Sequence, residues 1–268
     1  MREWKGTVSG RGSAAPRTQY LTTTPSPGAR LRLFCFHHAG GSASAFTALR
    51  NALAPHIDVM AVQLPGREGR LRESLPESMA NLVAELDEQL DPYLTGRYAC
   101  YGHSMGALVA HDLVARRQAR GEVLPVRLVA GAARAPQLPP AFASAHADSD
   151  DELITKVVSI GGMSAELVRY PDWVRPALEL TRADLRLCST RSPSATPPLD
   201  CSIDVFHGVA DPLISEHEAR AWAARSRSKS TFHLFEGGHF FFLRESPTSF
   251  AVRLADLLVP AKGLAMGH

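Results

Sequence analysis

The sequence lacks the features that mark several classes of protein. Its 268 residues include only four cysteines, at Cys35, Cys100, Cys188 and Cys201, with no CxxC pair and no other metal-ligand spacing. The 29 Lys and Arg nearly balance 27 Asp and Glu, which gives no case for nucleic-acid binding. No apolar run could span a bilayer, and the first residues lack the apolar centre of a secretory signal. We therefore expect a cytoplasmic protein with reduced, structural cysteines and with no metal, nucleic-acid or membrane partner.

The composition is that of an ordinary globular protein. Hydrophobic residues make up 45% and charged residues 21% of the chain, whose length suits one large α/β domain or two small ones. Residues 1–28 are rich in Ser, Thr, Gly, Pro and Arg and show no periodicity, which indicates a disordered N-terminal extension. We expect ordered structure to begin at Arg30 and a single domain to span 29–260.

Within this domain, short apolar runs alternate with helical patterns. The helix over 79–90 is expected to begin after a capping box formed by Ser74 and Glu77. Strands alternating with helices predict an α/β fold whose central sheet is mostly parallel and has helices on both faces. The expected strands are 31–36, 57–62, 98–101, 126–130, 202–207 and 231–235.

A stretch at 136–198 interrupts this alternation. It contains no convincing strand, but helical pieces are expected after a cap at Ser149 with Glu152, and over 163–168 and 173–187. Because it follows the carboxyl end of a strand, we expect a helical lid insertion over an active site; mere decoration of the fold is the alternative.

The pentapeptide Gly102-His103-Ser104-Met105-Gly106 joins an apolar run to a helical pattern. A G-x-S-x-G sequence between strand and helix is typical of a nucleophile elbow, in which a strained turn presents the serine hydroxyl. A chance match in a glycine-containing loop is the alternative. The context favours Ser104 as a catalytic nucleophile.

Two further residues complete a catalytic set. Serine needs an imidazole to accept its proton and a carboxylate to orient that imidazole. His239 follows an expected strand in a glycine-rich turn, and Asp211 lies in another turn after a strand, which gives the order Ser, Asp, His along the chain. Asp204 is the rival acid, but its position within a strand is too far from the sheet edge.

The loop after the first strand, His37 to Ala43, is expected to supply part of an oxyanion hole. We expect the N–H groups of Ala39 and Met105 to be the donors, with Gly40 as the alternative if the register slips by one residue. His37 and His38 are interpreted as loop and packing residues.

With these residues in place, the sequence resembles the type II thioesterases of polyketide and nonribosomal peptide pathways, members of the α/β-hydrolase superfamily. The resemblance covers about 30–258 and is most specific in the Leu-Pro-Gly-Arg-Glu run. The matching segments are 36–43, 63–68, 102–108, 150–153, 180–184 and 237–241.

The resemblance implies hydrolysis of aberrant or stalled acyl thioesters on the phosphopantetheine arm of acyl or peptidyl carrier proteins. No cofactor of the enzyme's own is implied, and a monomer is the default expectation. Arg67 is expected to help an acidic carrier protein dock. Alternatives are a carboxylesterase or lipase, a terminal product-releasing thioesterase domain, and a binding protein that keeps the fold without turnover.

Overall fold

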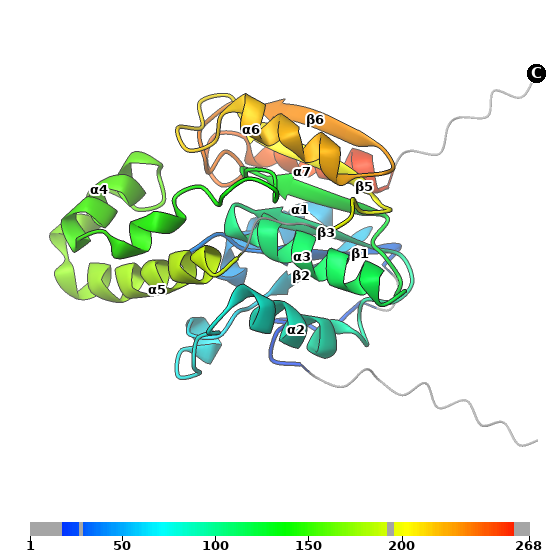
Figure 1. Ribbon diagram of the computed structural model, residues 1–268, viewed down its shortest axis with the longest axis horizontal. Helices are drawn as coiled ribbons and strands as arrows, with labels where there is room; N and C mark the ends of the chain where they lie inside the picture. The colour runs from blue at the N-terminus through cyan, green and yellow to red at the C-terminus, as the bar shows by residue number, and fades with distance from the viewer. Residues whose placement is uncertain (1–17, 27–28, 192–195, 260–268) are drawn as a thin grey trace, which may run out of the picture.

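One parallel sheet forms the centre of the protein (Figure 1). The computed structural model describes residues 18–26, 29–191 and 196–259. Six strands lie in the order β2-β1-β3-β4-β5-β6, and every neighbouring pair is parallel, in agreement with the mostly parallel sheet that the sequence predicts. The strands are β1 (Leu31–Phe36), β2 (Ile57–Val62), β3 (Tyr98–His103), β4 (Arg127–Gly131), β5 (Ser202–Gly208) and β6 (Ser230–Phe235).

Helices cover both faces of the sheet, so most strands are buried throughout and read as nearly continuous apolar runs. On one face pack α2 (Met79–Leu90), α3 (Met105–Ala119) and the short α6 (Glu216–Arg220). On the other pack α1 (Thr47–Leu53) and α7 (Pro247–Leu258). In the described ranges, no helix combines the length and apolar character needed to cross a bilayer.

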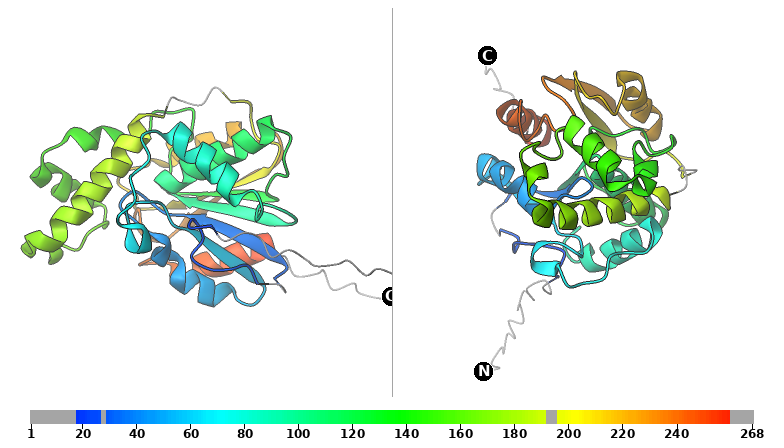
Figure 2. Two further views of the ribbon diagram at one scale, coloured as in Figure 1. Left: turned by 90° about the horizontal axis from the view of Figure 1, so that it is seen from below. Right: turned by 90° about the vertical axis from the view of Figure 1, so that its left-hand side faces the viewer.

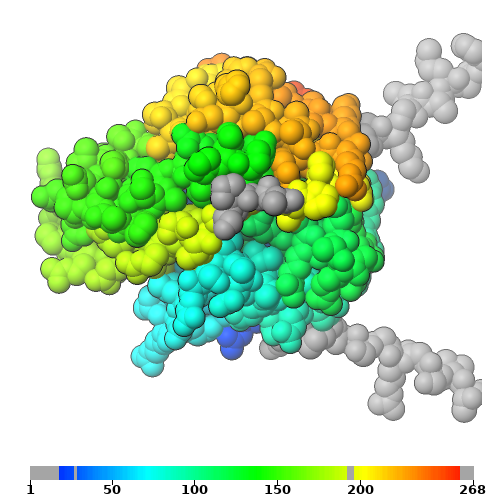
Figure 3. All heavy atoms as spheres, viewed as in Figure 1, coloured from blue at the N-terminus to red at the C-terminus, as the bar shows by residue number. Residues whose placement is uncertain are grey.

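The expected insertion lies between β4 and β5, and its regular elements within the described residues are all helical. It contains α4 (Asp150–Ser159) and α5 (Pro171–Ser189), with single 3-10 turns at Ala143–Ala147 and Leu167–Arg169. Figure 2 shows α4 and α5 projecting past one end of the sheet, and Figure 3 shows them as a lobe on the side of the main body.

Both ends of the insertion meet at one point on α3. The Arg191 guanidinium donates to the Pro136 carbonyl at 2.7 Å and pairs with the Asp112 carboxylate at 2.7 and 2.8 Å. The chain therefore leaves the main body and returns to it beside one buried side chain.

The structure corrects the expected start of the ordered domain. Tyr20 is only 1% exposed, its carbonyl accepts the Gln63 N–H at 2.9 Å, and the Arg70 guanidinium lies 4.1 Å from the centre of its ring. Leu21 forms an isolated antiparallel bridge with Val62 at the edge of β2. One aromatic residue supplies enough apolar area to hold this polar segment against the sheet. The rest of the expected extension, 1–17 and 27–28, lies outside the described residues.

Two local predictions were also wrong. Helix α2 begins after Ser78, whose hydroxyl accepts the Asn81 N–H, so the cap is not at Ser74. The helix expected over 163–168 is reduced to one 3-10 turn, because the Ser164 hydroxyl accepts the Glu166 N–H and competes with helical hydrogen bonding. The capping box of Ser149 and Glu152 is present as predicted.

Candidate active site

The predicted strand, sharp turn and helix are present around Ser104. Its backbone has φ 54° and ψ −116°, a strained conformation for a residue with a side chain, which costs about 1–3 kcal/mol. The Ser104 N–H donates to the Gly131 carbonyl at 2.8 Å. A Cβ on Gly102 would lie 2.1 Å from the Gly106 carbonyl oxygen, and one on Gly106 would lie 2.1 Å from the Phe36 carbonyl oxygen. Only glycine at both positions lets α3 approach the sheet this closely.

The elbow lies where the sheet changes its direction of growth. From β1 the chain continues to β2 on one side, and from β3 it continues to β4 on the other. Such a switch point opens a crevice at the carboxyl ends of the strands, where ligands of α/β proteins bind. The loops after β1 and β3 border this crevice, and those after β5 and β6 close it from the far side.

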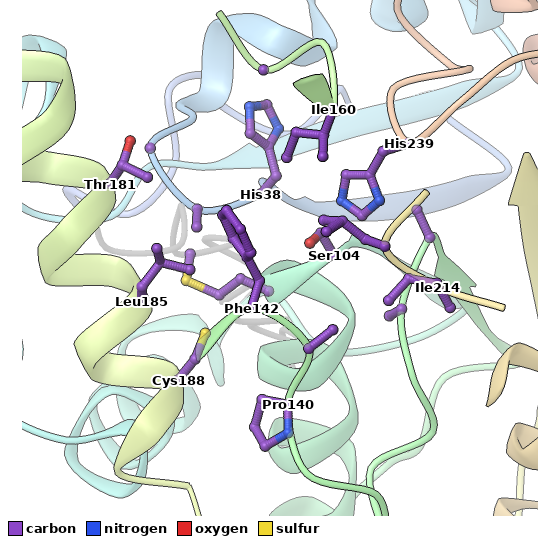
Figure 4. A pocket seen from close by; sticks show the side chains of 18 of the residues that line it. His38, Ser104, Pro140, Phe142, Ile160, Thr181, Leu185, Cys188, Ile214 and His239 are labelled. Carbon is purple, nitrogen blue, oxygen red and sulfur yellow. The ribbon is translucent and has the colours of Figure 1, made fainter. Parts of the chain in front are cut away.

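The structure brings the three predicted catalytic residues together. The His239 Nδ1 lies 2.9 Å from Asp211 Oδ2, and their side chains are 2% and 0% exposed. The other Asp211 oxygen accepts the N–H groups of Leu213 at 2.8 Å and Ile214 at 3.2 Å, which fixes the carboxylate. Ser104 and His239 line the same pocket, and Figure 4 shows their side chains next to each other.

The rival acid has a different role. Asp204 is fully buried within β5 and pairs with Arg127 and, at 2.7 Å, with His233. Asp204 is not among the residues that line the pocket, and it lies within β5, the position for which it was rejected on sequence grounds.

His103 supports His239 from beneath, a contact that the sequence analysis missed. Its Nε2 lies 2.9 Å from the His239 carbonyl oxygen, and its Nδ1 lies 2.8 Å from the Tyr101 hydroxyl. A carbonyl can only accept, so Nε2 carries the proton and Nδ1 accepts from Tyr101. Burial lowers the pKa of His103 well below its usual value, which keeps the ring neutral. The only sequence signal is its place inside the G-x-S-x-G motif.

The pocket is a cavity of about 110 Å³ between the main body and the insertion (Figure 4). Its lining is mostly apolar, and the polar side chains in it include Ser104, His239 and Thr181. Residues of the insertion that line it include Leu138, Phe142, Val157, Met163, Leu185 and Cys188.

The cysteines are free and buried, as expected from their apolar surroundings. Cys188 also lines the pocket, which the sequence analysis did not predict. Burial raises its pKa to about 12, so the group in the pocket is a neutral thiol. Nothing in the spacing of α5 residues could separate this role from simple core packing.

The two expected oxyanion donors, Ala39 and Met105, both border the pocket. Met105 is the first residue of α3, so its N–H has no partner within the helix. The Gly40 N–H, the alternative, donates instead to the Asp184 carboxylate at 2.8 Å and is already engaged.

The histidines beside Ala39 are neutral packing residues, and one of them also borders the pocket. Burial lowers the pKa of both His37 and His38 to about 3. His37 Nδ1 donates to the His38 carbonyl at 2.8 Å. The His38 ring packs edge-on against Phe240, 4.7 Å between centres, and lines the cavity.

Arg67 does not form the expected docking surface. It is 3% exposed and binds both carboxylate oxygens of Asp184, at 2.7 and 2.9 Å. The Leu-Pro-Gly-Arg-Glu run turns inward after β2, so the guanidinium has no surface to offer a partner.

Comparison with known proteins agrees with this geometry. A family model described as a thioesterase domain matches residues 31–258. The gramicidin S biosynthesis protein GrsT of Aneurinibacillus migulanus is 30% identical over 83% of this chain and 87% of its own length.

Solved structures give the same result. The thioesterase RedJ from the prodiginine pathway of Streptomyces coelicolor has a TM-score of 0.80 at 32% identity and covers 92% of this chain and 98% of its own. The type II thioesterase BorB from the borrelidin cluster has a TM-score of 0.75 at 32% identity, covering 89% and 94%. With a parallel sheet, a strained serine at its switch point and these relatives, the chain belongs to the thioesterase family of the α/β-hydrolase fold, whose members hydrolyse thioesters.

Proposed function

We propose that the protein is an editing thioesterase that removes aberrant or stalled acyl groups from the phosphopantetheine arm of carrier proteins in a nonribosomal peptide or polyketide assembly line. The observation that carries the proposal is the pairing of His239 with Asp211 in the pocket that Ser104 borders. The likeness to type II thioesterases such as BorB supports the carrier-bound substrate.

In the first half of the reaction, Ser104 Oγ attacks the thioester carbonyl. Asp211 occupies Nδ1 of His239, which leaves Nε2 to take the serine proton. The oxyanion of the tetrahedral intermediate accepts from the N–H groups of Ala39 and Met105. The C–S bond then breaks, the pantetheine sulfur takes the proton from His239, and the acyl group remains on Ser104.

The second half repeats these steps with water. His239 takes a proton from the water as it attacks the acyl-enzyme, and returns that proton to Ser104 Oγ when the ester bond breaks. The free acid leaves. Asp211 remains ionised throughout, holding the imidazole in one tautomer and stabilising its charged form.

The insertion serves as a lid that forms the acyl-binding wall of the pocket. Its side chains Phe142, Met163 and Leu185 face the cavity with apolar surface, which suits a hydrocarbon or weakly polar acyl group.

The test presents one short acyl group in three forms: on a holo carrier protein, on a small pantetheine thiol, and as an oxygen ester. Ser104→Ala is expected to lower kcat on the carrier-bound group by about 10⁶-fold, as loss of a serine nucleophile does elsewhere. Ser189→Ala is the matched control, because this residue is exposed and its hydroxyl donates to the Arg186 carbonyl within α5, away from the pocket.

The pattern of rates separates the alternatives. Ser104-dependent release from the carrier protein supports the proposal. Preference for the oxygen ester would indicate a carboxylesterase, cyclisation or release of a full-length product would indicate a terminal thioesterase domain, and absence of Ser104-dependent turnover would indicate a binding protein.

A further inference from the structure

A buried ion pair connects the insertion to the loop after β2 and also contacts the loop that carries Ala39. Asp184 lies on α5, and Arg67 lies in the loop after β2; both side chains are 3% exposed. The guanidinium binds the carboxylate through two hydrogen bonds, from Nη1 to Oδ2 at 2.7 Å and from Nη2 to Oδ1 at 2.9 Å. Arg67 Nε donates to the Pro65 carbonyl at 3.0 Å, which fixes the guanidinium from behind.

The same two side chains hold the backbone on both sides of Gly40. Asp184 Oδ2 accepts the Gly40 N–H at 2.8 Å, and Arg67 Nη1 donates to the Gly41 carbonyl at 3.2 Å. Gly40 directly follows Ala39 in the chain. Asp184 therefore fixes the peptide group next to the expected oxyanion donor.

Helix α5 also presses directly on this loop. Gly40 has φ +73°, and a Cβ there would lie 2.3 Å from the Thr181 hydroxyl oxygen, one turn before Asp184 on α5. The loop can lie this close to α5 only because residue 40 is glycine.

Stability alone does not account for such an arrangement. The cost of removing two charges from water largely cancels their attraction, so a buried ion pair is weak evidence of a stabilising role. The charges have a second consequence here. A lone carboxylate beside the oxyanion site would oppose the negative charge that develops in the transition state, and the bidentate Arg67 contact neutralises it.

We propose that Asp184 and Arg67 are positioning residues that hold the loop of Ala39 from helix α5, so that the Gly40 N–H is engaged and the Ala39 N–H is left facing the reacting carbonyl. This inference rests on the proposed role of Ala39 as an oxyanion donor. It makes the insertion part of the catalytic apparatus and not only the wall of the acyl pocket.

The test compares Asp184→Ala and Asp184→Asn with Asp112→Asn. The control weakens another ion pair at the base of the insertion, that of Arg191 with Asp112 on α3, which takes no part in the contacts of Asp184 with the Ala39 loop. Each variant is assayed on p-nitrophenyl acetate and on an acetyl-pantetheine thioester for kcat and KM. The Tm and the amide proton shift of Gly40 are measured in parallel.

We expect Asp184→Ala to lower kcat on both substrates by about 10²-fold, within the range found when an oxyanion donor is lost, with KM little changed. The Gly40 amide proton should move upfield as its charged partner disappears. Asparagine keeps one acceptor oxygen, which cannot serve Gly40 and both Arg67 nitrogens. Asp184→Asn should therefore also lower kcat, but by less than Asp184→Ala, about tenfold. Asp112→Asn should lower the Tm comparably while kcat stays within about threefold.

An unchanged kcat in either Asp184 variant overturns the inference, as does an equal loss of kcat in Asp112→Asn. Asp184→Asn keeps the side-chain volume and decides the matter if Asp184→Ala does not fold. The assay on the oxygen ester separates this inference from the proposed function. A wild type that prefers the oxygen ester would contradict the thioesterase proposal. The effect of the Asp184 variants on kcat for that ester would still test the positioning role of Asp184.

Discussion

At the scale of the residue, His103 shows how one side chain can hold the catalytic geometry from a distance. It donates to the backbone carbonyl of His239 and accepts from Tyr101, and all three groups are buried. His239 is thus fixed at two points, its ring by Asp211 and its backbone by His103.

Replacing His103 with Phe should therefore damage activity and stability by separate routes. Loss of the donor frees the His239 backbone and should lower kcat by about tenfold or more, while the Tyr101 hydroxyl is left buried without a partner, at a cost of about 1–3 kcal/mol in the free energy of unfolding. Steady-state kinetics and urea unfolding measure the two effects.

Tyr101→Phe provides the control for this prediction. The double variant His103→Phe/Tyr101→Phe removes both partners and should recover much of the stability but none of the activity. Recovery of activity in the double variant would contradict the positioning role of His103.

At the scale of the element, the close approach of α3 to β1 depends on Gly106. A methyl group there would meet the Phe36 carbonyl oxygen at 2.1 Å and the His37 carbonyl oxygen at 2.7 Å, both of them backbone atoms. Gly106→Ala should force α3 away from the sheet, lower the free energy of unfolding by about 1–3 kcal/mol or more, and misplace Ser104.

Gly69→Ala is the matched substitution for this prediction, because a Cβ at Gly69 would meet nothing within 4 Å. Its effect on stability should stay within about 0.5 kcal/mol. Thermal unfolding and kcat measured on both variants test the prediction, and a Gly106→Ala protein with unchanged Tm and kcat would contradict it.

The elements differ in how far their sequences predict them. Most of the strands were predictable because parallel strands buried on both faces leave nearly continuous apolar runs, as in Leu31–Phe36. Ser104, Asp211 and His239 could be placed at one sheet edge because each lies just past a predicted strand. The cap of α2 was misplaced because Ser74 and Ser78 both precede the helix at plausible positions.

Contacts between distant segments could not be predicted in this way. The pairing of Arg67 with Asp184 joins residues 117 positions apart, and neither carries a local signal of burial. Because charged side chains usually lie on the surface, Arg67 was expected to be exposed. Tyr20 was missed for a similar reason, since a single aromatic residue in a polar segment shows no periodicity.

At the scale of the whole molecule, buried neutral histidines should make the fold sensitive to acid. The pKa values of His37 and His38 are about 3, against an ordinary value of 6.5, and those of His103 and His111 are also lowered by burial. Between these values the unfolded chain binds protons that the folded chain does not. Stability should therefore be full above about pH 6.5 and fall as the pH drops towards 3, by up to about 1.4 kcal/mol per pH unit for each such group.

His37→Asn tests the contribution of one group, because the asparagine amide keeps a donor for the His38 carbonyl but does not titrate in this range. Its free energy of unfolding should depend less steeply on pH between 6.5 and 4 than that of the wild type, as measured by urea unfolding. The same slope in His37→Asn and in the wild type would contradict this account.

The single point at which the insertion leaves and rejoins the main body has an evolutionary consequence. Because Arg191 holds both Pro136 and Asp112, a segment of different length or shape could be exchanged there without disturbing the register of any strand. Such a cassette would carry its own acyl selectivity to an unaltered hydrolytic centre. The exchanged segment would have to keep a carboxylate equivalent to Asp184, which accepts the Gly40 N–H. The rest of the segment, and with it the substrate range, could then vary while that one residue is retained.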